Sequence, residues 1–250
     1  MAFTKDQVIH QFQQKRNNGM NILGSNAYTN ISNTFIESNE VDFYSVFNSD
    51  RFQLSEHGSL AGLLPYGDAN QIVLDIGKEV LSVYMNTPVF AGVCGTDTFR
   101  LMTTHLKKLK NIGFAGIQNF PSVGLIDGMF RDNLEETGIG YTLEIEMIRK
   151  ANELDMFTCP FVFNEQEAKD MVEVGADCIV IHKGLITQGP LGKKSALSDE
   201  SYIKKVQKIS DVGKSINPDV FVLCDGDSFQ GFDYVHYIVS RTENVDGIFG

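Results

Sequence analysis

Basic residues are scarce in this chain. Lysine and arginine number 21 against 32 aspartates and glutamates, which leaves a net charge of −11 over 250 residues. Non-specific binding to nucleic acid or to an anionic membrane needs a basic patch, so this charge argues against both kinds of partner. It does not argue against a phosphorylated small molecule, which needs only a local positive field.

Cysteine is also sparse, and no two cysteines are close in sequence. The four of them, Cys94, Cys159, Cys178 and Cys224, lie in four different apolar runs. The absence of a CxxC spacing excludes the usual signature of a zinc site, and no disulfide framework is indicated. The N-terminal stretch MAFTKDQVIHQF has no apolar signal region, and no apolar run reaches the length that crosses a bilayer. We therefore expect a reduced, cytoplasmic setting.

The sequence does contain a regular alternation of short apolar runs and amphipathic segments. The repeat of about 30 residues is typical of βα-units. No linker or shift in composition divides the chain, so the pattern predicts a single α/β domain over residues 1–250, most simply a (β/α)8 TIM barrel. An open doubly wound sheet is the alternative. The predicted strands are Met20–Gly24, Val41–Phe47, Pro88–Val93, Phe114–Ile117, Phe157–Phe163, Asp177–Ile181, Val220–Cys224 and Val245–Phe249.

Helices are predicted between these strands and before the first one. The extra helix, Lys5–Asn17, carries Val8, Ile9 and Phe12 on one face and is expected to cover the amino-terminal end of the barrel. No eighth helix follows the last strand. We therefore expect either that residues 1–250 are a truncated form of a longer protein or that a partner subunit fills the gap. The alternative is that Lys5–Asn17 occupies the empty position. Two further predicted helices are Thr34–Asn39 and Phe229–Ser240.

The most distinctive stretch is FAGIQNFPSVGLIDGMFRDNLEETG, from Phe114 to Gly138. A short apolar run is followed by a glycine-bearing polar segment, and a helical period starts only after Gly138. We interpret this as a buried strand, a long loop and a helix. Such loops lie at the carboxyl ends of parallel strands, where barrels place their sites. A mobile lid whose charges are merely solvated is the alternative.

Several segments together resemble the phosphoenolpyruvate hydrolase-like family of TIM-barrel proteins. They are GSLAGLLPYGDAN (Gly58 to Asn70), AGVCGTDTF (Ala91 to Phe99), and FAGIQNFPSVGLIDGMFRDNLEETGIGY (Phe114 to Tyr141). The segments GADCIVIHKGL and VDGIFG resemble the family more loosely. The resemblance implies a TIM barrel, usually homo-oligomeric, related in shape to enzymes that act on phosphoenolpyruvate and pyruvate. Family members attached to regulatory proteins also suggest a role in signal transduction.

Two loops depart from the family pattern. The first predicted strand runs into GSNAYTN, with Gly24 alone where the family usually has a GAGAG-like turn. After the seventh strand stands Gly226-Asp227-Ser228 in place of a GGP-like turn. Asp227 adds a negative charge where a phosphate is expected.

Candidate functional residues stand at the carboxyl ends of the predicted strands. We expect Asp97, Glu135 and Glu136 to ligate a divalent metal, Mg or Mn, and Asp97, Glu136 and His182 to take catalytic roles, His182 as acid or base. Carboxylate oxygens suit these hard cations, and a metal assists phosphoryl transfer. The predicted substrate-binding residues are Asn48, Arg51, Asn119, Lys183, Asp225 and Gly226.

Each candidate also has a structural interpretation. Asp97 stands just before a predicted helix that starts near Phe99, so it is equally suited to capping that helix. Glu135 and Glu136 fit solvated loop charges, and His182 is a lone strand-end histidine. Arg51 is close enough in sequence to pair with Asp50 or Glu56 on the surface. Asn119 and Asp225 are residue types that shape loops and turns.

Two functions from different classes fit these features. The first is a metal-assisted hydrolase, or a lyase, acting on phosphoenolpyruvate or a related small oxo-acid. The second is a non-catalytic small-molecule sensor or interaction protein that keeps the barrel. The unaltered central loop favours the enzyme, whereas the altered first and seventh loops favour the sensor.

Overall fold

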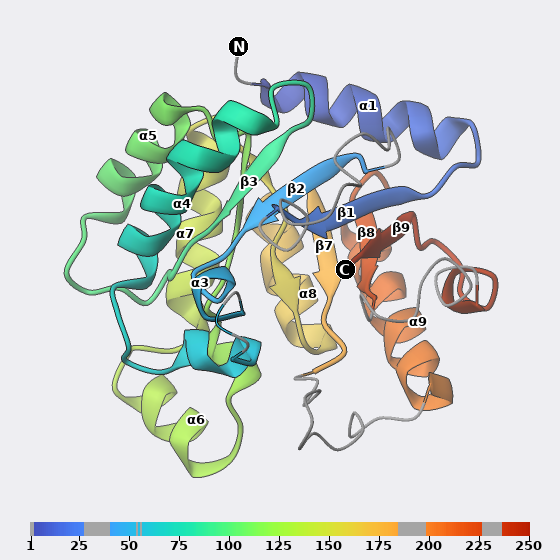
Figure 1. Cartoon of the computed structure of the whole chain (residues 1–250). Helices are drawn as coiled ribbons and strands as arrows, with labels where there is room; N and C mark the ends of the chain where they lie inside the picture. The colour runs from blue at the N-terminus through green and yellow to red at the C-terminus, as the bar shows by residue number, and fades with distance from the viewer. Residues whose placement is uncertain (1–2, 28–40, 54, 56, 185–198, 227–236) are drawn as a thin grey trace.

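The computed structural model describes residues 3–27, 41–53, 55, 57–184, 199–226 and 237–250. Its strands form one parallel sheet in the order β5-β4-β3-β2-β1-β9-β8-β7-β6 (Figure 1). Their bounds are β1 Ile22–Asn26, β2 Phe43–Val46, β3 Val89–Gly92, β4 Gly116–Gln118, β5 Phe157–Thr158, β6 Phe161–Val162, β7 Cys178–Ile181, β8 Phe221–Asp225 and β9 Gly247–Phe249. Each strand overlaps one of the runs that the sequence predicts.

The two ends of this sheet are halves of one predicted strand. β5 and β6 both lie within Phe157–Phe163 and are separated by Cys159 and Pro160. Cys159 N donates to Ile117 O at 2.9 Å on the β4 side, and Val180 N donates to Pro160 O at 2.8 Å on the β7 side. The hydrogen bonding therefore runs round a closed ring of strands. This confirms the predicted α/β barrel and excludes an open sheet.

Helices surround the ring (Figure 1). Their bounds are α3 Asp50–Gln53, α4 Ala69–Val83, α5 Met102–Ile112, α6 Gly128–Glu136, α7 Tyr141–Glu153, α8 Glu165–Glu173 and α9 Asp199–Ile216, with 3-10 turns η2 Ser59–Leu63 and η3 Val123–Leu125. Strand side chains alternate between two apolar layers. Along β2, Tyr44 and Val46 pack outward against the helices, whereas Phe43 and the following Phe47 point into the barrel. None of the helices in these described ranges is long and apolar enough to cross a membrane.

Helix α1 (Lys5–Asn17) closes the amino-terminal end of the barrel, as predicted. It is capped by Thr4, whose hydroxyl accepts from Gln7 N. Its basic side chains bind carboxylates that stand immediately before strands: Lys5 binds Asp177 at 2.8 Å, Lys15 binds Asp42 at 3.1 Å and Arg16 binds Asp246 at 2.7 Å. These contacts exclude the alternative position beside strands eight and one.

The barrel interior is unusually aromatic. Phe12 of α1 enters from the amino-terminal end, and its ring lies 5.6 Å from Phe43, 5.3 Å from Phe157 and 5.4 Å from Phe221, which begin β2, β5 and β8. Barrels are more often filled by branched aliphatic residues. Glycines on neighbouring strands make room for the rings. A Cβ on Gly92 would stand 2.5 Å from the Phe47 ring, and one on Gly116 would stand 2.7 Å from Phe90.

The segment after β4 differs from the prediction in one respect. Where the sequence predicts an unbroken loop up to Gly138, the structure has the turn η3 and the nine-residue helix α6. Gly128 and Gly138 flank α6 and both have positive φ angles, 60° and 75°, a conformation that glycine tolerates best. The two glycines therefore mark the ends of a helix and not positions within a loop. The predicted helix Thr34–Asn39, Asp227 and most of Phe229–Ser240 lie outside the described residues.

Candidate functional site

Polar side chains gather at the carboxyl ends of β7 and β8. His182 follows β7, Asp225 ends β8, and His182 Nδ1 lies 3.2 Å from Asp225 Oδ2. Lys183 is 6% exposed, donates through its backbone N to Asp225 Oδ2 at 3.1 Å, and places Nζ 3.2 Å from Asp199 Oδ1. Register explains the meeting, because the pairing of β7 with β8 ends at Ile181 and Cys224, and His182 and Asp225 are the next residues in the sequence. Three predicted site residues are thus brought together.

Nδ1 of His182 faces one donor and one carboxylate. Gly184 N lies 3.0 Å from it and Asp225 Oδ2 lies 3.2 Å from it. Nδ1 accepts from Gly184 N when it carries no proton, and it donates to Asp225 when it carries one. The ring stacks on Phe163 with centroids 5.2 Å apart and planes at 24°. Burial lowers the pKa of His182, and the Asp225 carboxylate opposes that shift. Burial therefore favours the neutral imidazole, whereas the Asp225 carboxylate favours the imidazolium.

Gly226 lies directly after this cluster. Its N–H donates to Phe249 O at 2.7 Å, so the amide is used in the sheet. A Cβ there would stand 2.6 Å from Ile248 Cγ2. Close packing against Ile248 therefore explains why glycine stands at position 226. The part of Gly226 in substrate binding stays a prediction.

Asn119, at the end of β4, is fully buried and fully bonded. Its Oδ1 accepts from Phe161 N at 2.7 Å, and its Nδ2 donates to Glu144 Oε2 at 2.6 Å and to Phe161 O at 3.2 Å. The side chain thus completes the ring between β4 and β6. Asn119 positions backbone and the Glu144 carboxyl rather than presenting a free amide.

Glu144 is a buried carboxyl that the sequence did not single out. It lies on α7, is 0% exposed, and also accepts from Ser122 Oγ at 2.7 Å and from Val123 N at 2.8 Å. Burial raises its pKa to about 8, although these hydrogen bonds act in the opposite direction. Glu144 therefore fixes the start of the segment after β4.

Asp97 lies in the loop after β3 and contacts an arginine. Its carboxylate binds the Arg100 guanidinium, accepts from Asn70 Nδ2 at 2.9 Å, and accepts from Phe99 N at 2.9 Å. Arg100 also binds Asp68 at 2.6 Å. Burial raises the pKa of Asp97, but the hydrogen bonds outweigh it and the net shift is downward. Helix α5 begins only at Met102 with Leu101 at its N-cap, so Asp97 does not cap it.

Glu135 and Glu136 lie at the end of α6 and are exposed. Glu135 binds Arg131 Nε at 2.6 Å and accepts from Tyr141 N at 3.1 Å. Glu135 and Asp97 thus bind different groups. Within the part of the chain that the structure describes, no three His, Cys, Asp or Glu side chains are arranged to hold a metal ion. The proposed ligand set does not fit one metal in this conformation.

The loop after β2 holds Asn48, Asp50 and Arg51. Asn48 is 3% exposed and donates to Gly62 O at 2.8 Å, while its buried Oδ1 has no hydrogen-bond partner among the described residues. Arg51 is exposed, whereas Asp50 is 0% exposed and accepts from Asn26 Nδ2 at 2.6 Å and Phe47 N at 2.8 Å. Burial raises the pKa of Asp50 to about 7. The surface pair between Arg51 and Asp50 is therefore not formed.

Phenylalanine rings fill the space between these polar groups. Phe47, Phe120, Phe161 and Phe249 are between 3% and 7% exposed, and the Phe47 ring lies 4.9 Å from that of Phe120 and 5.9 Å from those of Phe161 and Phe249. Phe161 also contacts His182 at 5.2 Å. The sequence showed these residues only as apolar, because their meeting depends on strand register.

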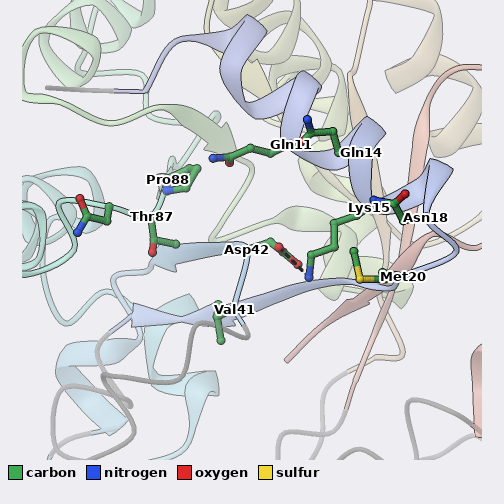
Figure 2. Close-up of a pocket in the computed structure, with 10 residues that line it drawn as sticks. Gln11, Gln14, Lys15, Asn18, Met20, Val41, Asp42, Thr87 and Pro88 are labelled. Carbon is green, nitrogen blue, oxygen red and sulfur yellow. Dashed lines mark ion pairs between the residues drawn. The ribbon is translucent and has the colours of Figure 1, made fainter.

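A polar cavity of about 260 Å³ lies at the opposite end of the barrel (Figure 2). It is lined by residues of α1 and of the segments that precede β2 and β3, among them Asp42, Thr87 and Pro88. The Lys15–Asp42 ion pair spans it (Figure 2). The amino-terminal face of such barrels serves stability, and we assign no chemistry to this cavity.

A closed parallel barrel with ionisable side chains at the carboxyl ends of its strands is a (β/α)8 protein with its candidate site in the usual place. The family model described as phosphoenolpyruvate hydrolase-like matches residues 7–250. The chain belongs to this family, which confirms the resemblance.

Individual relatives and solved structures are similar to this chain in sequence or in fold. The ToMV susceptible protein tm-1(GCR26) and the ToMV resistance protein Tm-1(GCR237), both of Solanum lycopersicum, are 47% and 46% identical over 243 residues, 97% of this chain and 32% of each relative. The chain thus spans about a third of their length. A phosphonopyruvate hydrolase in complex with oxalate and Mg²⁺ has a TM-score of 0.61 at 11% identity, covering 99% of this chain and 80% of its own. A 2,3-dimethylmalate lyase of the PEP mutase/isocitrate lyase superfamily scores 0.58 at 10% identity, with 99% and 81% covered.

Proposed function

We propose that this protein is a hydrolase, or a lyase, acting on phosphoenolpyruvate or a related small oxo-acid. One observation carries the proposal: the His182 imidazole lies 3.2 Å from the Asp225 carboxylate at the carboxyl ends of β7 and β8, and Lys183, a cation, follows directly. The backbone N of Lys183 bonds to Asp225, and its Nζ lies 3.2 Å from Asp199. An acidic chain that binds an anionic substrate needs such a local cation. The family and the similar fold of a phosphonopyruvate hydrolase support the substrate class.

The proposed roles follow from the bonds at each atom. Lys183, with Arg51 at the rim, supplies positive charge for phosphate or carboxylate. His182 is neutral because burial lowers its pKa, so it acts first as a base and takes a proton from the attacking water as the water oxygen bonds to phosphorus. The resulting imidazolium, beside the Asp225 carboxylate, gives that proton to the enol oxygen as the bond from that oxygen to phosphorus breaks. Asn48 stays a predicted substrate-binding residue, because its buried Oδ1 has no partner in the described residues.

A divalent metal, Mg or Mn, stays part of the proposal on the strength of the family. When bound, it would neutralise charge on the transferred group. Because Asp97, Glu135 and Glu136 do not converge in the described conformation, we assign no step to it. Cytoplasmic location, a homo-oligomeric state and the lack of nucleic-acid or membrane partners also stay predictions, as does membership of a longer protein.

A thermal-shift and turnover experiment tests the enzyme. We expect phosphoenolpyruvate with Mg²⁺ or Mn²⁺, at about 100 times its dissociation constant, to raise the melting temperature by roughly 5–10 °C. Lys183→Gln should remove most of this shift, and the exposed Lys107→Gln should keep it. Release of phosphate or pyruvate must accompany binding. Equal responses of the two variants, or no response in the parent, would contradict the proposed site.

A second candidate function is a non-catalytic sensor of small oxo-acids. The aromatic residues that fill the mouth favour it, because Phe47, Phe120, Phe161 and Phe249 offer no groups for phosphoryl transfer. The altered loops at Gly24 and Gly226 point the same way. A ligand-dependent rise in melting temperature without turnover, at any tested pH, identifies the sensor.

Matched neutral substitutions test the carboxylates. If Asp97 and Glu136 are metal ligands, Asp97→Asn and Glu136→Gln should each weaken metal-linked stabilisation by at least tenfold in apparent affinity. Asp97→Asn should in addition cost about 1 kcal/mol of unfolding free energy, because the partly buried Arg100 loses a charged partner. Glu136→Gln should leave stability within about 0.5 kcal/mol. Parent-like metal binding in both variants would show that the ligand assignment is wrong.

A further inference from the structure

We propose that α6 is a docking helix for a basic, amphipathic segment of another polypeptide. Its outer face, here called the α6 face, consists of Met129, Phe130, Asp132 and Glu136. It combines exposed apolar side chains with carboxylates. Neither the barrel chemistry nor the interior packing explains this surface.

The apolar part of the α6 face is strongly exposed. Met129 is 79% and Phe130 is 62% exposed, and α6 has no buried residue. A nine-residue helix is marginal in water unless tertiary contacts hold it. Adjacent exposed Met and Phe side chains ringed by polar residues mark interaction sites more often than random surface. Met also adapts to the shape of a partner.

The α6 face is preformed because the opposite side of the helix is tied to the barrel. Arg131 donates from one terminal nitrogen to Val123 O at 2.8 Å and from the other to Glu167 at 3.2 Å, while its Nε binds Glu135. Leu134 packs against the apolar layer under the helices. Figure 1 shows α6 projecting beyond the other helices at one end of the molecule. A partner therefore meets a surface that needs little ordering.

Charge selects the kind of partner. The segment Asp127–Glu136 carries four carboxylates, Asp127, Asp132, Glu135 and Glu136, against one arginine. Since Arg131 turns inward to Val123 and Glu167, Asp132 and Glu136 remain at the exposed face. Lysine or arginine flanking an apolar stripe complements this arrangement. A second copy of the chain would bring the same carboxylates together, so self-association through the α6 face is disfavoured.

A binding experiment with a defined probe tests the proposal. The probe is a labelled synthetic helical peptide of roughly 18 residues, with leucines at i, i+3, i+4 and i+7 and lysines elsewhere. A scrambled peptide of equal composition is the reference. We expect fluorescence anisotropy to show saturable binding of the helical peptide, at least tenfold tighter than the scrambled one. Affinity should fall as NaCl rises from about 0.05 to 0.5 M.

Variants locate the binding surface. Met129→Ser with Phe130→Ser, and separately Asp132→Lys with Glu136→Lys, should each weaken binding at least tenfold with unchanged melting temperature. Phe99→Ser with Leu101→Ser is the apolar control, because those residues are 98% and 81% exposed on another loop. Glu79→Lys on α4 is the charge control. Equal losses in the controls, parent-like binding by both α6 variants, or concentration-dependent dimerisation abolished by Met129→Ser with Phe130→Ser would each overturn the proposal.

Discussion

Phe12→Ala is expected to lower the free energy of unfolding by about 3–5 kcal/mol. Phe12 is 0% exposed and contacts three other rings, each at the start of a different strand. Removing it deletes buried apolar area and leaves a cavity. The rigid strand ends around that cavity cannot collapse to fill it. The ion pairs of Lys5, Lys15 and Arg16 would still hold α1 in place but would not replace the lost packing.

Denaturant unfolding followed by circular dichroism measures this loss. Phe12→Leu keeps most of the volume and should cost less than half as much, which gives a second value if the alanine variant expresses poorly. Phe99→Ala is the matched control, since a 98% exposed ring loses little on truncation and should change stability by less than about 0.5 kcal/mol. If Phe12→Ala and Phe99→Ala were equal, α1 would not be packed into the barrel as described.

The sequence predicted the barrel well because the signal for it is local. Each predicted strand is a short apolar run between polar segments, and a parallel strand buried on both faces must be apolar throughout. Helix α1 was predicted at its observed bounds, Lys5–Asn17, because an apolar face indicates the helix and the Asn17-Asn18-Gly19 stretch marks its end. The fifth strand was predicted as one run, and its division at Pro160 reflects a residue that has no amide hydrogen to donate.

The site was predicted less completely because its contacts are long-range. His182, Lys183 and Asp225 could be placed at strand ends, and parallel pairing brings them together. Glu144 was missed because a carboxylate within an amphipathic helix is normally assigned to the solvent-facing side. Its position between Leu143 and Ile145 was only a weak indication of burial. Asp50 was treated as a surface charge, whereas the short helix α3 turns it inward toward Asn26. Helix α6 was missed because its flanking glycines resemble those of a loop.

Glu144 should make the protein less stable as the pH rises above neutrality. Its pKa is raised from 4.5 to about 8 in the folded state, so the folded protein holds a proton that the unfolded chain has released. The resulting stabilisation is complete below pH 4.5 and is lost as the pH rises through about 8. For a shift of this size the loss is on the order of 5 kcal/mol. Asp50, with its pKa raised to about 7, adds to the loss over the lower part of this range.

The histidines act in the opposite direction, which sets the pH window for the measurement. Burial lowers the pKa of His105 to about 4 and also lowers that of His182, so stability rises with pH up to the unfolded value of 6.5. We therefore expect the free energy of unfolding to fall between about pH 6.5, the unfolded pKa of the histidines, and about pH 8, the folded pKa of Glu144, in the parent. Glu144→Gln should flatten that fall. At pH 6 the same variant should be less stable than the parent by about 1–3 kcal/mol, because the added amide lacks an acceptor beside Val123 N and Asn119 Nδ2.

Glu136→Gln, the same change at an exposed site on α6, should keep the parental pH dependence. If the free energy of unfolding of Glu144→Gln depended on pH as it does in the parent, the buried carboxyl of the parent would be ionised over the whole pH range, stabilised by Asn119, Ser122 and Val123 alone.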